Sequence, residues 1–182
     1  MTGENSFVRL SGDGGKTVTD RASHWRVLWC PAGAGHALFL QSTLLGGEVR
    51  VFGDNAAVVR WLQKTIETYL YPAFADETLA ITKAEFSRGG DVRATTVEDV
   101  TAGGQRIRLS WSDTIAPFVL AMPPGSGNRP IGVFSTFFPA RRASIEIDGK
   151  AAAGKPWAEM RGDRPASSAC LAWSETWVKP RE

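Results

Sequence analysis

One amphipathic segment, residues 54–71, narrows the range of folds more than any other pattern in the chain. Apolar residues recur there at steps of three and four positions, the spacing of one helix face: Val58, Trp61, Leu62, Ile66, Tyr69 and Leu70. Asp54 or Asn55 can cap the first turn, and Pro72 prevents continuation. The polar face, predicted to meet water, carries Arg60, Gln63, Lys64 and Glu67. A lone helix with one apolar face needs a flat apolar partner, so the pattern predicts a helix on a sheet.

The other segments are typical of short strands separated by turns. Residues 24–30 place Trp25, Val27 and Trp29 at alternate positions, which is the strand period. Further strands are expected at 37–45, 48–52, 79–86, 92–100, 105–113, 131–138, 144–147 and 168–178. Asp148-Gly149 is a strong signal for the tight turn of a hairpin. Residues 1–20 are polar and glycine-rich, and we expect a loose lead-in or an edge hairpin there.

This pattern predicts a mainly β fold, a single antiparallel barrel of roughly eight or nine strands with the helix at 54–71 packed on it. The length of 182 residues agrees with one domain over 1–182. The architecture is analogous to lipocalin-like (calycin-like) barrels, although the Gly-x-Trp opening of true lipocalins is absent. Closed barrels of about eight strands can hold one small ligand. A cone-shaped α+β fold and a helix-grip fold are alternatives, but the sequence lacks the terminal helices that they need.

Charge and motifs exclude several classes of function. The net charge is only +2 and the basic residues are scattered, which argues against nucleic-acid binding. No segment approaches the roughly 20 apolar residues that span a bilayer. The N-terminus has no signal-peptide pattern, which favours a cytoplasmic location. We expect no metal and no cofactor, because nucleotide-binding motifs are missing and His24 and His36 are the only histidines.

Carboxylates on apolar strand faces are the candidate catalytic residues, and Glu175 is the first of them. Strict alternation places Glu175 between Trp173 and Trp177, on the same strand face as Ala169 and Leu171. We expect this bulkier face to point inward. Desolvation by the tryptophans would raise the pKa of Glu175 and suit it to general acid catalysis. The alternative is a carboxylate at the barrel rim, paired with an arginine.

Asp113 and Glu85 are the second and third candidates. Asp113 continues the apolar face that ends at Trp111, but an aspartate that bonds its own backbone in a turn before Pro117 is favoured, because Asp is common in turns. Glu85 shares a face with Lys83, whose charge it would neutralise if that end is wet.

Aromatic residues on strands suggest a lined pocket. Pockets for small molecules are mostly apolar and aromatic, with few polar groups. The candidates for substrate binding are Trp25, Trp29, Trp111, Trp173, Trp177 and Phe137. A solid aromatic core is equally compatible with these residues.

The leading hypothesis is a barrel that binds a small hydrophobic molecule, such as a terpenoid, a polyketide or an aromatic compound. As an enzyme it would be a cofactor-independent lyase, isomerase, hydratase or cyclase, with Glu175 as the acid or base and Asp113 as its complement. The alternatives are a non-catalytic carrier or sensor, and an interaction domain with a solid core. Apart from the small molecule, the partner considered is a second copy in a homodimer.

Overall fold

A computed structural model describes residues 1–91 and 93–178, except for the side chain of Asn128. The strands are β1 (Thr2–Leu10), β2 (Asp20–Cys30), β3 (Gly33–Gln41), β4 (Val49–Gly53), β5 (Ile81–Lys83), β6 (Glu85–Asp91), β7 (Thr95–Ala102), β8 (Gln105–Thr114), β9 (Phe118–Met122), β10 (Ile131–Ile147), β11 (Lys150–Ala151), β12 (Ala158–Arg161), β13 (Arg164–Ser167) and β14 (Ala169–Val178). The helical elements are η1 (Thr43–Leu45), α1 (Ala56–Leu62), η2 (Gln63–Glu67), α2 (Thr68–Leu70), η3 (Pro72–Ala75) and η4 (Ser126–Asn128). The longest helical stretch joins α1, η2 and α2 and is called the central helix below.

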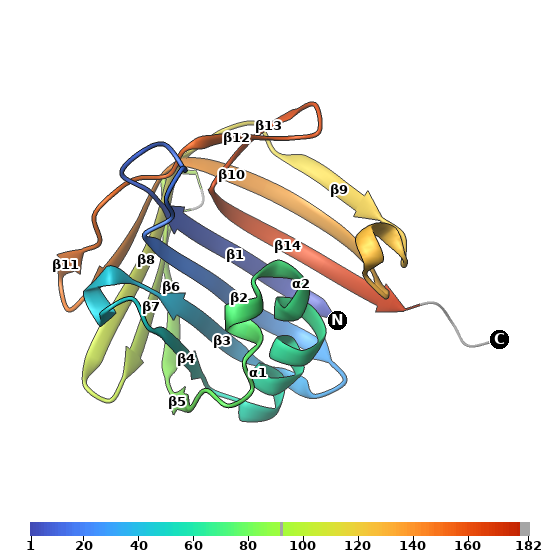
Figure 1. Ribbon diagram of the computed structural model, residues 1–182, viewed down its shortest axis with the longest axis horizontal. Coiled ribbons are helices and arrows are strands. Elements are labelled where there is room, and N and C mark those ends of the chain that lie inside the picture. Colours follow the sequence, from blue (N-terminus) through green and yellow to red (C-terminus); the bar gives the residue numbers. More distant parts are fainter. Residues whose placement is uncertain (92, 179–182) are drawn as a thin grey trace.

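The strands form one 12-stranded sheet, in which the order is β5-β4-β3-β2-β1-β14-β10-β8-β7-β6, with β9 and β11 also paired to β10. β12 and β13 form a separate pair. The two ends of this order are joined through Ala84, whose N–H donates to the Gly53 carbonyl oxygen at 3.1 Å. The sheet therefore curls into a nearly closed barrel (Figure 1).

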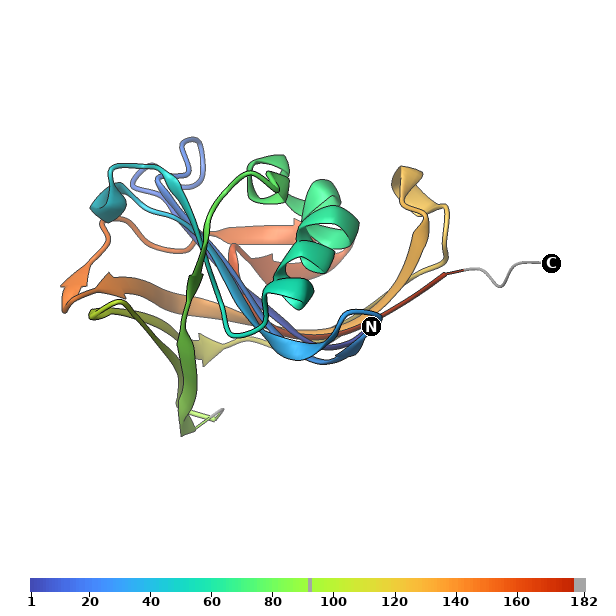
Figure 2. The same ribbon diagram turned by 90° about the horizontal axis from the view of Figure 1, so that it is seen from below.

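The predicted fold class is confirmed as mainly β with a barrel-shaped sheet, but its details are wrong in two respects. The sheet is mixed, because β4 and β5 run parallel, and it has more strands than the eight or nine expected. The additional strands are β1, β9 and β11, and the predicted segment 79–86 is divided into β5 and β6. β9, β10 and β14 also run on past the barrel as a curved extension (Figure 2). Sequence periodicity predicts which face of a strand a residue occupies, but it does not predict how far the strand extends beyond the neighbouring strands.

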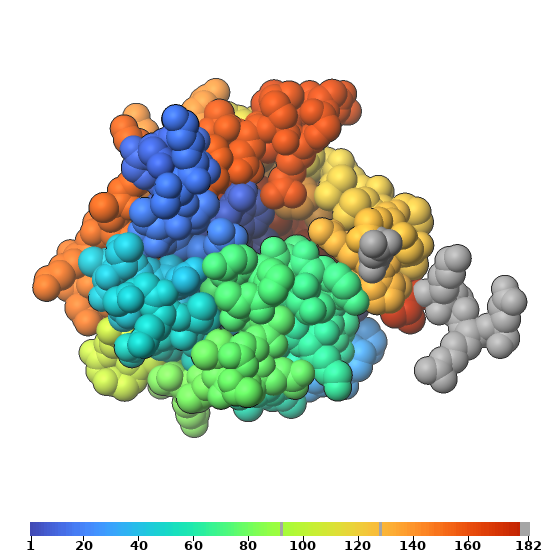
Figure 3. Space-filling view, viewed as in Figure 1, coloured from blue at the N-terminus to red at the C-terminus, as the bar shows by residue number. Residues whose placement is uncertain are grey.

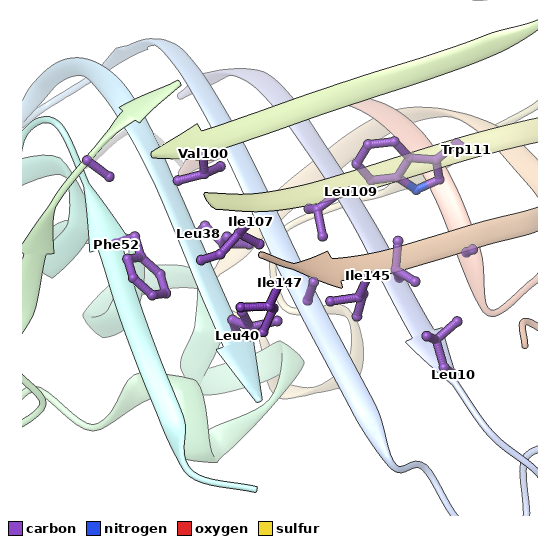
Figure 4. Packing of buried hydrophobic residues seen from close by; sticks show 14 of the residues in the cluster. Leu10, Leu38, Leu40, Phe52, Val100, Ile107, Leu109, Trp111, Ile145 and Ile147 are labelled. Atoms are coloured by element: carbon purple, nitrogen blue, oxygen red, sulfur yellow. The ribbon is translucent and has the colours of Figure 1, made fainter. Parts of the chain in front are cut away.

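The barrel interior is filled largely by apolar side chains from opposite walls. Leu38 and Leu40 of β3 and Phe52 of β4 belong to the same buried cluster as Leu109 and Trp111 of β8. Figure 4 shows these side chains meeting between the two walls. Trp111 is 1% exposed, and its indole N–H donates to the Phe7 carbonyl oxygen at 3.0 Å. This part of the barrel is packed as a core.

A buried ion cluster shares the interior with the apolar side chains. The Arg88 guanidinium donates from Nε to Glu98 at 2.6 Å and from Nη2 to Glu4 at 2.5 Å. His24 Nε2 lies 3.4 Å from Glu98 Oε1, and Arg26 lies 3.5 Å from the other Glu98 oxygen. Glu4, His24 and Glu98 are almost completely buried. With two carboxylates and two guanidinium groups, the cluster is neutral when His24 is neutral.

The central helix covers the outer face of the barrel beside β2 and β3, on the side toward which β9 curves (Figure 2). Asn55 caps its first turn through bonds from the N–H groups of Ala57 and Val58, as the sequence predicts. Val58 and Leu62 are buried there against Phe39 and Trp25.

The second half of the helix does not keep the predicted face. Residues Gln63–Glu67 form a π-helical turn, which adds a residue to the turn and rotates everything that follows. Gln63 and Glu67, expected in water, are therefore buried. Tyr69 and Leu70, expected in the core, are 38% and 45% exposed, and Trp61 is only partly buried.

Other sequence expectations are corrected at the strand level. Residues 2–10, expected as a loose lead-in or an edge, form β1 in the middle of the sheet between β2 and β14. The segments 131–138 and 144–147 belong to one continuous strand, β10. The tight turn at Asp148-Gly149 is confirmed, with φ of 51° and 77°. None of the described helices is both long enough and apolar enough to cross a membrane.

Candidate functional site

A cavity of about 230 Å³ lies outside the barrel, between the central helix and the outer face of the sheet. Its floor comes from β1, β2, β14 and β10, and its walls come from the central helix on one side and from β9 and β12 on the other. The space-filling view shows this hollow between the green helix and the orange and gold segments (Figure 3). We call it the helix–sheet cleft.

Strand alternation explains the composition of the cleft floor. Positions that alternate with the barrel interior point outward, so Phe7 of β1, Phe137 of β10 and Ser174 of β14 face the cleft. The Phe137 ring stacks on Phe118 at a centroid distance of 5.2 Å. Ser135 and Ser174 bond each other through their hydroxyl oxygens at 2.7 Å. The floor is thus apolar and aromatic, with a few small polar groups.

Glu67 is a fully buried carboxyl group at the cleft, placed there by the π-helical turn. Its Oε1 accepts bonds from the Ser23 hydroxyl at 2.6 Å and from the Trp25 indole N–H at 2.7 Å. Its Oε2 is buried and has no hydrogen-bond partner among the described residues. Burial raises the pKa of Glu67 to about 7, against the opposing effect of the two hydrogen bonds. The group can therefore gain or lose a proton near neutral pH.

Four arginines also line the cleft. Arg9 of β1, Arg21 of β2 and Arg161 of β12 lie on strands, and Arg129 follows η4. Arg9 and Arg21 are direct cross-strand partners. Arg9 forms an ion pair with Glu159 at 2.6 Å. We call the three on strands, Arg9, Arg21 and Arg161, the arginine group.

The predicted catalytic carboxylates do not come together. Glu175 lies on the exposed face of β14, paired in register with Thr2 and Phe134, so the expected interior position is wrong. The desolvation that motivated its acid–base role is missing there. Asp113 is exposed near the end of β8, has a φ of 54° and accepts a bond from Arg141 at 3.2 Å, so it does not lie in the barrel interior. Glu85 is exposed on β6.

The predicted aromatic residues divide among three environments. Trp25 and Phe137 line the helix–sheet cleft. Trp111 belongs to the packed barrel core. The tryptophans were expected to point into the barrel. This is wrong for Trp25, which faces the cleft on the outer side, and for Trp29, Trp173 and Trp177, which are 60%, 48% and 43% exposed. Trp173 and Trp177 are on the same face of β14 as the inward residues Ala169 and Leu171, but they lie in the part of β14 that extends beyond the barrel.

Sequence reasoning missed Glu67 and the arginine group. Gln63 and Glu67 are four residues apart, so on a regular helix they share one face, and two polar residues on one face predict a solvent-exposed surface. Gln63 in fact bonds the carbonyl oxygens of Phe74 and Asp76, at 3.0 and 2.8 Å. One signal in the sequence was the position of Arg9 and Arg21 on the two arms of a hairpin. Like charges directly opposite each other destabilise a sheet, so such a pair indicates a role other than stability.

No group of three His, Cys, Asp or Glu side chains that could hold a metal ion occurs in residues 1–91 and 93–178. Comparisons with protein-family models, with curated proteins and with solved structures each found no match. The geometry of the cleft is therefore the basis for assigning a function.

Proposed function

We propose that the protein binds a small, mainly apolar molecule in the helix–sheet cleft. The observation that carries this proposal is a walled cavity with an aromatic and aliphatic lining and a few polar groups at defined positions, as in small-molecule sites generally. The site differs from the expected one in position, because it lies on the outer face of the barrel.

The size of the cavity limits the ligand. A volume of 230 Å³ equals that of about eight water molecules in the liquid. This is slightly below the usual range for drug-sized ligands, roughly 300–1,000 Å³. One or two small aromatic ring systems or a medium-length alkyl chain is therefore the kind of apolar body that fits.

Binding is tested with N-phenyl-1-naphthylamine, an uncharged dye that fluoresces in apolar surroundings. We expect saturable binding at one site per chain. Val133, which lines the cleft, is replaced by tryptophan to fill it. The Val133→Trp variant should bind the dye at least about tenfold more weakly, because the added ring occupies the space that the ligand needs.

A matched control uses the same change on the opposite face. Val119 of β9 is 56% exposed and does not line the cleft. Val119→Trp should bind the dye as the wild-type protein does. Equal binding by wild type, Val133→Trp and Val119→Trp would place the dye elsewhere and reject the cleft as the site.

A second candidate function, proton transfer to or from the bound molecule, is favoured by Glu67. Glu67 borders the cleft, its Oε2 has no partner among the described residues, and its pKa near 7 is suited to a general acid or base. The reaction class would be a cofactor-independent isomerisation or elimination, as the sequence also suggested, with Glu67 in place of Glu175.

The environment of Glu67 has a measurable effect on stability. Its pKa is raised from 4.5 to about 7 on folding, so the folded protein holds this proton more tightly than the unfolded chain. The contribution of Glu67 to the free energy of unfolding is fully present below pH 4.5 and is lost as the pH rises through 7. The loss is about 3 kcal/mol, since each unit of pKa difference corresponds to about 1.36 kcal/mol. We expect Glu67→Gln to lack this fall in urea unfolding measured from pH 4.5 to 8. Charged groups that line the same cleft, Arg9, Arg21, Arg129 and Arg161, keep their charge over this range.

Glu175→Gln is the control, because the same change is made at an exposed carboxylate. Its pH profile should parallel that of the wild type. If Glu67→Gln also parallels the wild type, the pKa of Glu67 is not raised on folding, and the pKa argument for proton transfer near neutral pH fails.

A further inference from the structure

The arginine group places positive charge in a largely apolar cleft. Arg9 and Arg21 face each other across β1 and β2, and like charges directly opposite one another destabilise a sheet. Burial lowers the pKa of Arg21, and the neighbouring Arg9 lowers it further. Burial also lowers the pKa of Arg161, with Arg9 and Arg129 acting in the same direction. The fold thus holds several like charges together at a cost in free energy.

The charge is only partly compensated from within the protein. Arg9 has Glu159 as a partner at 2.6 Å. For Arg21 and Arg161, the described part of the chain provides no carboxylate at ion-pair distance and no hydrogen-bond acceptor for the guanidinium group. The Nε of Arg21 is buried without any partner. Elsewhere the protein pairs its partly buried arginines, as Arg88 is paired in the ion cluster.

Aromatic rings hold both unpaired guanidinium groups in defined orientations. The Arg21 guanidinium carbon lies 3.8 Å from the centroid of the Tyr71 ring, and the Arg161 carbon lies 5.1 Å from that of Phe137. Stacking occupies the flat face of a guanidinium group and leaves its N–H edge free. These edges suit anionic oxygens, which arginine binds with two parallel hydrogen bonds.

We infer that the ligand of the helix–sheet cleft is amphipathic, with an anionic carboxylate or phosphate group bound by Arg21 or Arg161 and its apolar body lying on the aromatic floor. This inference rests on the proposed binding function and names the chemistry of the ligand. Arg9, already paired with Glu159, would fix the position of its neighbours rather than bind the anion.

The test is displacement of the bound N-phenyl-1-naphthylamine by three molecules with the same chain: decanoate, decyl phosphate and decanol. We expect the anions to compete at least about tenfold more strongly than decanol, because a charge-assisted bond to arginine is stronger than a neutral one. The tighter of the two anions identifies the head group. Equal competition by all three in the wild-type protein would overturn the inference and leave the proposed function standing. Failure of the dye to bind, or its binding to Val133→Trp as to wild type, would reject the proposed function itself.

Two variants connect the preference to the arginines. Arg21→Met and Arg161→Met keep a long apolar side chain but remove the charge. The variant that lacks the arginine bound to the anion should lose most of the preference, while both variants keep a dissociation constant for the dye within about twofold of the wild-type value. Arg106→Met, at an exposed arginine paired with Asp99 far from the cleft, should keep the full preference. If the anion preference survives in both cleft variants, the anion is bound elsewhere and the inference is wrong.

Discussion

Replacement of Trp111 by alanine is expected to lower the free energy of unfolding by about 3–5 kcal/mol, the usual cost of deleting a large aromatic side chain from a core. Trp111 is 1% exposed and packs in the barrel with Leu109 and Ile145. The substitution leaves a cavity and also removes the bond from its indole N–H to the Phe7 carbonyl oxygen. Urea unfolding monitored by circular dichroism measures the effect.

Trp173→Ala supplies the comparison, since Trp173 is 48% exposed on the extension of β14. We expect it to cost less than about 1 kcal/mol, as surface substitutions do. Equal losses for the two tryptophans would mean that Trp173 is buried in solution, by a partner or by a second copy of the chain.

Replacement of Glu98 by alanine is the second large effect, also about 3–5 kcal/mol, because it leaves buried charge without compensation. Glu98 is fully buried and is the shared partner of Arg88, His24 and Arg26. Glu48→Ala is the control, since Glu48 forms only a solvent-exposed pair with Arg50 at 3.8 Å. Such exposed pairs contribute about 0–1 kcal/mol. A similar small loss at Glu98 would show that water or another group replaces the carboxylate.

The ion cluster also predicts acid sensitivity. Burial opposes ionisation of Glu98, but His24 and Arg88 outweigh it and hold the pKa at about 2, below the ordinary 4.5. Its stabilising effect is therefore present above pH 4.5 and is lost as the pH falls through 2. Unfolding curves of Glu98→Gln should depend less on pH in this window than those of the wild type.

The sequence predicted the elements better than their faces. Strand alternation correctly placed Ala169 and Leu171 in the barrel. The same alternation predicted an interior position for Glu175, which lies on the surface because β14 continues past the wall that would bury it. Helix periodicity correctly buried Val58 and Leu62, and then failed after the π-helical turn at Gln63–Glu67. Both errors come from local geometry that a constant period does not contain.

β1 was overlooked for a different reason. Its inward positions include Glu4 and Ser6, which look like surface residues until Arg88 is placed beside Glu4 by a strand more than 80 residues away. The cleft shares this property, because Arg21, Glu67 and Arg161 come from separate regions of the chain. Only the tertiary structure brings such groups together.

The central place of β1 also determines when the fold can be completed during synthesis. β1 pairs with β2 as soon as both have left the ribosome, but its other neighbour is β14, as the register of Val8 with Ala169 shows. At about 5–20 residues per second, the ribosome needs on the order of ten seconds to make the chain between them. One edge of β1 stays open throughout, and open strand edges pair readily with other chains. The newly made chain, rather than the finished barrel, is therefore the form in which this protein is most prone to aggregate.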